Sequence, residues 1–134
     1  MTKKILIVED NEQNLYLTTF LMEKQGYDVV QARNGQEGLD AAAAERPDLI
    51  LLDIQLPVMD GYEVAGRLKQ AQETQSIPIV AVTSYAMAGD REAVLAAGCE
   101  GYIEKPIDPD SFVEQVKGFL NAERGSRNGD QFGR

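Results

Sequence analysis

Residues 49–52 are a run of four large apolar residues that ends directly at a carboxylate, Asp53. A continuous apolar run of this kind is typical of a strand buried on both faces, as parallel strands are in α/β sheets. The segment Lys4–Val8 is similarly apolar and is followed by Glu9 and Asp10. The carboxyl ends of parallel strands share one edge of the sheet, where open α/β sheets bind their ligands. We therefore expect three acids to meet at this edge.

Strand-like and helix-like segments alternate five times along the chain. The expected strands are residues 4–8, 27–31, 48–52, 77–82 and 101–103, and the expected helices begin near residues 11, 35, 61, 89 and 109. Because the connections are short, this order predicts an α/β fold: a doubly wound, five-stranded parallel sheet with right-handed crossovers.

The expected domain covers residues 1–122, and 134 residues suffice for a single hydrophobic core. Residues 123–134 contain three glycines and one apolar residue, which favours a disordered C-terminal tail. In the first helix, Leu17, Phe20 and Leu21 have the spacing of a buried stripe. Leu15, Tyr16 and Met22 fall outside that stripe and are interpreted as surface residues.

Charge and composition exclude several classes of function. A net charge of −9 and a pI near 4.4 oppose nucleic-acid binding by bulk electrostatics. No apolar run approaches the roughly 18 residues of a membrane span, and the N-terminus lacks the features of a signal peptide. Cys99 is the single cysteine, which fits a reducing cytoplasm. The absence of histidine excludes His-dependent catalysis and a phosphohistidine on this chain.

Four strand ends contribute polar side chains to the same predicted edge. Glu9 and Asp10 follow the first strand, Asp53 the third, Thr83 the fourth and Lys105 the fifth. Clustered acids without nitrogen or sulfur ligands suit a hard cation, and Mg²⁺ fits best because it takes few carboxylates and keeps waters. A nucleophilic carboxylate, a metal, a lysine and a hydroxyl together indicate a phosphoryl-acceptor site.

Four segments also resemble a known family. Residues 5–11, 51–61, 80–84 and 102–106 resemble the receiver domains of two-component response regulators, and the likeness extends over residues 3–121. The closest type is a single-domain, chemotaxis-regulator-like receiver. The resemblance implies the flavodoxin-like (βα)5 fold with strand order 2-1-3-4-5.

The resemblance also implies a role for each site residue. Asp53 would be the phospho-acceptor, and Mg²⁺ would be held by Asp10, Asp53 and the Gln55 backbone carbonyl, with Glu9 acting mainly through water. Thr83 and Lys105 would contact the phosphoryl group, and Tyr102 would turn inward when Thr83 moves. The peptide bond before Pro106 would be cis.

The implied function is that of a cytoplasmic, stand-alone response regulator rather than an enzyme acting on external substrates. A histidine kinase or histidine phosphotransfer protein would supply the phosphoryl group. The face formed by the fourth helix, fifth strand and fifth helix would then control a downstream protein, with no nucleic acid or membrane involved. A docking patch for the histidine-bearing partner is the alternative interpretation of Leu15, Tyr16 and Met22.

Three alternatives remain open. An aspartyl-phosphate hydrolase would carry a second Asp two residues after the nucleophile, where this chain has Gln55. A flavodoxin-type cofactor binder would need a glycine- and hydroxyl-rich first turn, whereas residues 9–12 are mostly acidic and would repel a phosphate. The chain could also be the receiver fragment of a longer hybrid protein, although Met1 and the polar tail favour a complete one.

Overall fold

The computed structural model describes residues 2–84 and 87–127 of the chain. Strands and helices alternate through this part, in the order β1 (Lys4–Val8), α1 (Glu12–Lys24), β2 (Asp28–Ala32), α2 (Gly35–Glu45), β3 (Leu49–Asp53), α3 (Gly61–Gln70), β4 (Ile79–Thr83), α4 (Ala88–Ala96), β5 (Gly101–Glu104) and α5 (Pro109–Arg127). The strands pair in parallel in the order β2-β1-β3-β4-β5. The predicted fold class and strand order are confirmed.

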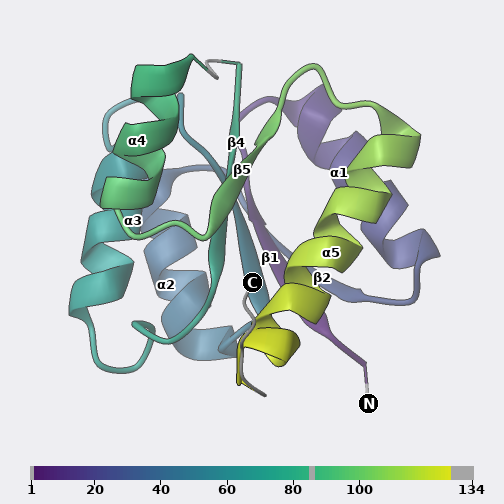
Figure 1. Cartoon of the computed structure of the whole chain (residues 1–134), viewed down its shortest axis with the longest axis horizontal. Coiled ribbons are helices and arrows are strands. Elements are labelled where there is room, and N and C mark those ends of the chain that lie inside the picture. Colours follow the sequence, from purple (N-terminus) through teal and green to yellow (C-terminus); the bar gives the residue numbers. More distant parts are fainter. Residues whose placement is uncertain (1, 85–86, 128–134) are drawn as a thin grey trace.

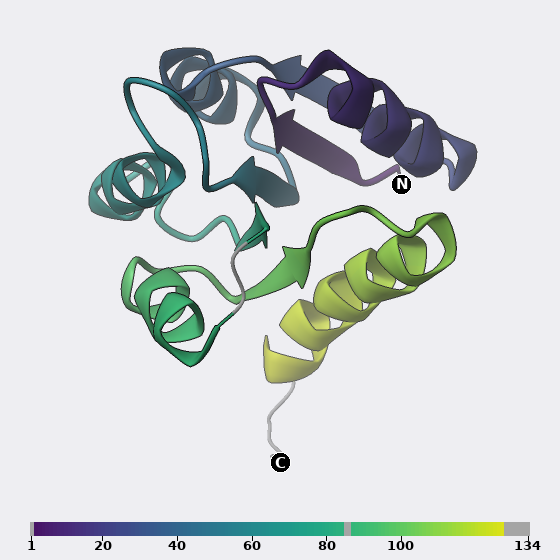
Figure 2. The same cartoon turned by 90° about the horizontal axis from the view of Figure 1, so that it is seen from above.

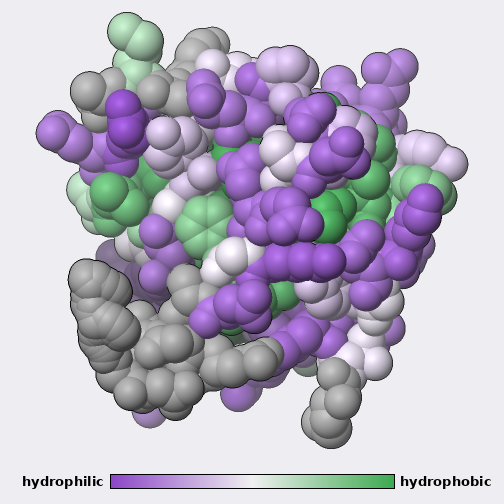
Figure 3. Space-filling model, turned by 45° about the vertical axis from the view of Figure 1, so that its right-hand side comes forward, coloured by the Kyte–Doolittle hydropathy of each residue, from purple (hydrophilic) through white to green (hydrophobic). Residues whose placement is uncertain are grey.

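The sheet forms the middle layer of three (Figure 1). Seen from above, α1 and α5 cover one face, and α2, α3 and α4 cover the other (Figure 2). Every residue of β3 and β4 is buried, as their continuous apolar sequences predict. Figure 3 shows the side that carries α1 and α5, where hydrophilic side chains cover most of the described surface and hydrophobic ones appear in small separate areas.

Alternate residues of each strand face opposite layers, so the sheet has two cores. The core under α1 and α5 includes Ile5, Ile7, Leu49, Leu51, Val80, Val82 and Ile103. The core under α2, α3 and α4 includes Leu6, Val8, Ile50, Leu52, Ile79 and Ala81. The same alternation determines the face of the sheet toward which the Cβ of each functional residue on a strand points.

The buried face of α1 agrees with the prediction at Leu21, which is buried, and at Leu17, which packs against the core, but differs from it elsewhere. Leu15 and Met22 are buried, whereas Phe20 is 50% exposed and Tyr16 is 73% exposed. The buried face of the helix includes Thr18, which a count of apolar residues leaves out. Burial of Thr18 is possible because its hydroxyl donates to the Asn14 carbonyl oxygen at 2.8 Å. The expected patch of Leu15, Tyr16 and Met22 is therefore wrong for two of its three members.

Side-chain caps begin the helices that follow β1, β2 and β3. Asn11, Asn34 and Asp60 each accept a hydrogen bond from a backbone N–H in the first turn, at 2.9, 2.9 and 3.0 Å.

At the other end of the chain, α5 continues to Arg127, so residues 123–127 are helical where a tail was expected. No proline interrupts this stretch. The rest of the expected tail, residues 128–134, lies outside the described residues.

Candidate functional site

Three carboxylates meet at the carboxyl edge of the sheet. Asp53 is the last residue of β3, and Glu9 and Asp10 directly follow β1, its neighbour in the sheet. One carboxylate oxygen from each lies within 4.8 Å of the other two. Asp53 is 2% exposed and Glu9 is 4% exposed, while Asp10 faces solvent. The sequence prediction that these acids converge is confirmed by this geometry.

Lys105 supplies the positive charge of the cluster. Its Nζ lies 3.2 Å from Glu9 Oε1 and 3.4 Å from Asp53 Oδ1. The backbone N–H of Lys105 donates to the Thr83 carbonyl oxygen at 2.8 Å, which anchors the loop that follows β5. The Lys105–Pro106 peptide bond is cis, as the resemblance implied. The lysine therefore reaches both buried acids from the edge strand.

Burial and mutual repulsion both disfavour the charged forms of these acids. Desolvation, followed by the charge of Asp53, raises the pKa of Glu9 from 4.5 to about 7, although Lys105 and the Asn11 N–H oppose this shift. The Asn11 N–H donates to Glu9 Oε2 at 3.1 Å. Lys105 forms ion pairs with two of the three carboxylates, and a further cation would relieve the repulsion among the three.

The donor set fits a divalent metal. All three side chains offer oxygen, the ligand atom that hard cations such as Mg²⁺ prefer. The mixture of buried and exposed acids suits an ion that keeps part of its water shell. The Gln55 backbone N–H donates to Asp53 Oδ1 at 3.0 Å, so the peptide of Gln55 lies beside the cluster. Glu9, Asp10 and Asp53 could together hold Mg²⁺ at this edge.

The loop between β3 and α3 closes tightly around Asp53. The Gly61 N–H donates to the Ile54 carbonyl oxygen at 3.0 Å, and a Cβ on Gly61 would lie 2.6 Å from Ile54 Cα. Only glycine permits this approach. Val58, at the exposed tip, has a φ of 67°, a conformation that β-branched residues rarely adopt. No pattern in the sequence indicates this strained position.

Thr83 and Tyr102 belong to β4 and β5, the two strands that follow β3 in the order of the sheet. Thr83 ends β4 and, by strand alternation, starts on the side of Ile79 and Ala81, under α3 and α4. Asp53 starts on the opposite side, with Leu49 and Leu51. The Tyr102 ring packs against the Thr83 side of the sheet, and Arg91 Cζ lies 6.0 Å from the ring centroid.

Sequence reasoning missed one contact of the site. Gln55 entered the prediction through its backbone carbonyl, yet its side chain is also engaged. Gln55 Nε2 donates to Thr83 Oγ1 at 2.7 Å, and Gln55 Oε1 accepts from the Ser84 N–H at 3.4 Å. No sequence pattern indicates this contact, because it joins the loop after β3 to the end of β4, 28 positions along the chain.

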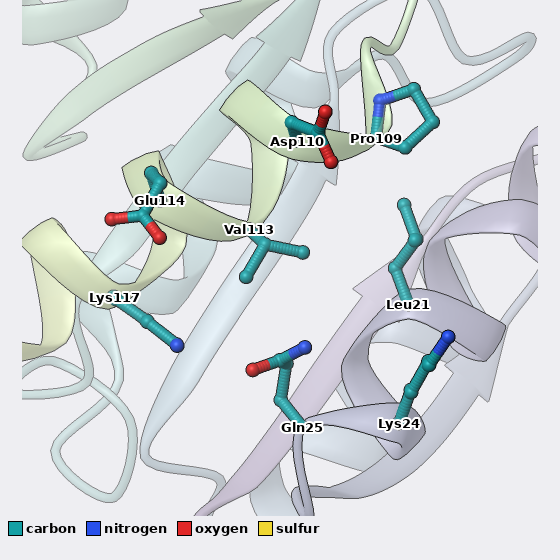
Figure 4. Close-up of a pocket in the computed structure, with 8 residues that line it drawn as sticks. All are labelled: Leu21, Lys24, Gln25, Pro109, Asp110, Val113, Glu114 and Lys117. Carbon is teal, nitrogen blue, oxygen red and sulfur yellow. The ribbon is translucent and has the colours of Figure 1, made fainter.

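A groove between α1 and α5 lies apart from the acid cluster (Figure 4). Its volume is about 430 Å³, and Leu21, Val113 and Lys117 are among the residues that line it. None of the acid-cluster residues lines this groove.

Within the described part of the chain, no helix combines the length and the apolar character that a membrane crossing requires.

Known proteins are similar to this chain in both sequence and fold. Residues 5–117 match the family described as the response regulator receiver domain. The chain is 50% identical over 120 residues to the polar-differentiation response regulator DivK of Brucella anthropi, which covers 90% of this chain and 98% of the relative.

Two solved structures add to this likeness. A CheY-like response regulator receiver domain protein from Methanospirillum hungatei has a TM-score of 0.85 at 32% identity and covers 96% of this chain and 100% of its own. The receiver domain of a sensor histidine kinase from Pseudomonas aeruginosa has a TM-score of 0.82 at 31% identity, with 90% and 99% covered. It is described with a magnesium ion coordinated in its active site cleft.

Proposed function

Because the chain belongs to the response regulator receiver domain family, we propose that Asp53 accepts a phosphoryl group and that the chain acts as a stand-alone regulator of a protein partner. The observation that carries this proposal is the environment of Asp53. It is 2% exposed, it shares a cluster with Glu9 and Asp10, and Lys105 Nζ lies 3.4 Å away. A buried carboxylate in this setting suits phosphoryl transfer, which depends on positioning and charge.

A phosphohistidine donor must lie on another protein, since this chain contains no histidine. A carboxylate oxygen of Asp53 attacks the phosphorus of a partner's phosphohistidine. The new O–P bond forms as the P–N bond breaks, and the electron pair returns to the imidazole nitrogen, which takes a proton from solvent. Lys105 stays beside the phosphoryl oxygens and offsets their negative charge. The donor is thus a histidine kinase or a histidine phosphotransfer protein.

Mg²⁺ is the cofactor we propose for the acid cluster. Asp10, Asp53 and the Gln55 backbone carbonyl would hold it, with Glu9 acting mainly through water. When bound, the ion would supply positive charge to the carboxylates and to the phosphoryl oxygens. This assignment is supported by the all-oxygen donor set. The pKa of Glu9 is raised to about 7, first by burial and then by the negative charge of Asp53, and a bound cation would oppose both effects.

Phosphorylation would act through the Thr83 side of the sheet. The modification adds about −1.5 to −2 charges and three strong acceptors at Asp53. Thr83 would donate to the phosphoryl group, and Tyr102 would turn inward, which changes the face formed by α4, β5 and α5. Moving this equilibrium from about 1% to 99% active requires roughly 5.5 kcal/mol of differential stabilisation. That face would bind the downstream protein.

The cellular role is proposed by similarity. The Brucella relative is named for polar differentiation, and it is matched over 98% of its length at 50% identity. We extend a role in polar differentiation to this chain on that likeness.

Gln55 stands two residues after Asp53, the position at which an aspartyl-phosphate hydrolase would carry a second acid. Its amide is neutral and contacts Thr83, which does not favour hydrolysis of external phosphoesters.

A phosphotransfer assay tests the proposed function. A histidine kinase or phosphotransfer protein carrying radiolabelled phosphohistidine is mixed with this chain in Mg²⁺. We expect label to move to the wild type within seconds to minutes and not to the Asp53→Asn variant. Glu92→Gln, which changes an exposed acid of α4, is the matched control and should accept label normally. Equal labelling of wild type and Asp53→Asn would contradict the proposal.

A further inference from the structure

We propose that the groove between α1 and α5 binds α5 of a second copy of this chain, so that two copies associate about a two-fold axis with their α5 helices antiparallel. None of the residues that line the groove belongs to the acid cluster. The inference therefore goes beyond the proposed phosphoryl transfer and does not depend on it. The order of charges along the groove points to this occupant.

The groove has an apolar floor between two charged walls. Leu21 of α1 is buried, and Val113 of α5 packs against the same core. In Figure 4, Val113 extends from α5 toward the wall formed by α1. An apolar floor with a polar rim is the type of surface that binds one face of an amphipathic helix. We therefore expect a helix to occupy the groove.

Charges of opposite sign lie at opposite ends of the groove. Figure 4 shows Asp110 near the upper end, and Lys24 and Lys117 toward the lower end, on opposite walls. Glu114, one turn after Asp110 in α5, also lines the groove and extends its acidic part. Asp110 and Lys117 are about 10 Å apart along α5, at 1.5 Å per residue. The groove thus fits a helix that carries its charges in the reverse order.

The same helix of a second copy meets this requirement when it runs antiparallel. A two-fold axis between positions 113 and 114 places Asp110 of each copy opposite Lys117 of the other, because both positions are equally far from the axis. Both contacts form together, since a two-fold interface uses the same patch of each copy. Lys24 lies at the same end as Lys117 and adds a second cation near the incoming acid. A parallel pairing would instead place like charges opposite each other.

An exposed aromatic ring borders the basic end of the groove. Phe20 is 50% exposed, and Lys24 Nζ lies 5.8 Å from the centroid of its ring. Lys24 itself lines the groove, so a helix bound there lies close to this ring. Partial burial of Phe20 would add apolar contact area to an interface whose rim is mostly charged.

The expected association is weak. A net charge of −9 on each copy opposes their approach, which favours a transient interface. An exposed ion pair typically changes an association constant by roughly 1.4- to 5-fold. Charge reversal at Asp110 or at Lys117 turns both attractive pairs of the dimer into repulsive ones. We expect either reversal to weaken association by at least roughly 4-fold.

Sedimentation equilibrium of Lys117→Glu, Asp110→Lys and wild type tests the pairing. The proteins are examined in EDTA, without a phosphoryl donor, from micromolar to millimolar concentrations. We expect wild type to associate as its concentration rises, and each variant to associate more weakly. A mixture of the two variants should associate more tightly than either alone, because each introduced charge then faces its opposite. A wild type that stays monomeric, or a mixture no tighter than its components, overturns the inference.

Glu92→Lys is the matched control, because it reverses an exposed acid of α4 on the other face of the sheet. It should associate as wild type does, and weakening equal to that of Lys117→Glu would refute the assignment to this groove. The variants should keep their helix content in circular dichroism. The Asp108 carboxylate, which accepts the Ser111 N–H at 3.0 Å, still caps α5 in all of them.

A measurement on wild type alone locates the interface. Amide resonances of Gln25, Val113 and Lys117 should shift when the protein is diluted, since these residues line the groove. Shifts confined to α4 and β5 would place the contact elsewhere and overturn the inference. Because no Mg²⁺ or phosphoryl donor is present, failure of these tests leaves the proposed role of Asp53 intact. Failure of phosphoryl transfer likewise leaves the association intact.

Discussion

Removing the charge of Asp53 should make the metal-free protein more stable. Asp53→Asn keeps the size of the side chain and an oxygen that can accept the Gln55 N–H, now bonded at 3.0 Å. Lys105 retains Glu9 at 3.2 Å as its partner. The substitution therefore changes the charge of the cluster with little change in its hydrogen bonding.

The distances give the magnitude. At an effective dielectric constant of about 20, two unit charges 4.8 Å apart repel each other by roughly 3.5 kcal/mol. Asp53 has two acidic neighbours at or within this distance, whereas Lys105 at 3.4 Å returns roughly 4.9 kcal/mol of attraction. Water screens part of the repulsion from exposed Asp10, which lowers the gain in stability expected from Asp53→Asn. The cost of burying the charge of Asp53 is absent in the variant, which raises that gain. We expect Asp53→Asn to raise the free energy of unfolding by about 2 kcal/mol.

Urea denaturation at pH 8, with EDTA or with Mg²⁺, measures this difference. In EDTA the midpoint for Asp53→Asn should lie above that of wild type. Mg²⁺ should stabilise wild type more than the variant, because a ligand that binds the folded state adds stability that rises with the logarithm of its affinity. Glu92→Gln on α4 serves as a control for the loss of any one negative charge. If Asp53→Asn is no more stable than wild type in EDTA, charge crowding is not the feature that defines this site.

Three other substitutions or treatments follow from the structure. Lys105→Met should fold but lose most phosphoryl transfer to Asp53, measured by intact mass after incubation with acetyl phosphate and Mg²⁺; transfer at the wild-type rate would remove Lys105 from the site. Val58→Gly should raise the free energy of unfolding by about 0.5–1 kcal/mol in urea, because glycine adopts the φ of 67° without strain, and a lower value would mean that the valine is not strained. Burial raises the pKa of the Cys99 thiol from 9.0 to about 11, so native protein at pH 8 should react slowly with a thiol reagent and rapidly once unfolded. Since the folded state retains this proton, wild type should also lose more stability between pH 9 and 11 than Cys99→Ala does, and equal losses would contradict the burial effect.

Local sequence was sufficient to predict the sheet and the position of the acids. The apolar runs that end at Val8 and Asp53 identify two buried parallel strands, and parallel pairing brings their carboxyl ends together. Lys105 was placed correctly because it directly follows the last strand. These predictions depend on strand order and alternation, which the sequence encodes over short distances.

Contacts between distant loops could not be predicted in the same way. The hydrogen bond between Gln55 and Thr83 depends on how the loop after β3 approaches the end of β4, and no periodic pattern in the sequence indicates that approach. The buried face of α1 was predicted correctly at Leu21 but not at Phe20, because Thr18 is polar and does not count toward an apolar stripe. Its hydroxyl is satisfied within the helix, so burial is compatible with its chemistry. Composition also did not indicate that α5 continues to Arg127, because residues 123–127 belong to a glycine-rich segment that favours a tail.

The most direct test of the central claim is to map the modified residue after Mg²⁺-dependent phosphorylation. The chain is treated with acetyl phosphate, reduced with borohydride to convert an aspartyl phosphate to homoserine, and analysed by peptide mass spectrometry. Homoserine should appear at position 53 with Mg²⁺ and should be absent with EDTA. Homoserine at Asp10 instead, or equal conversion of Asp53 with and without Mg²⁺, would contradict the account of this site.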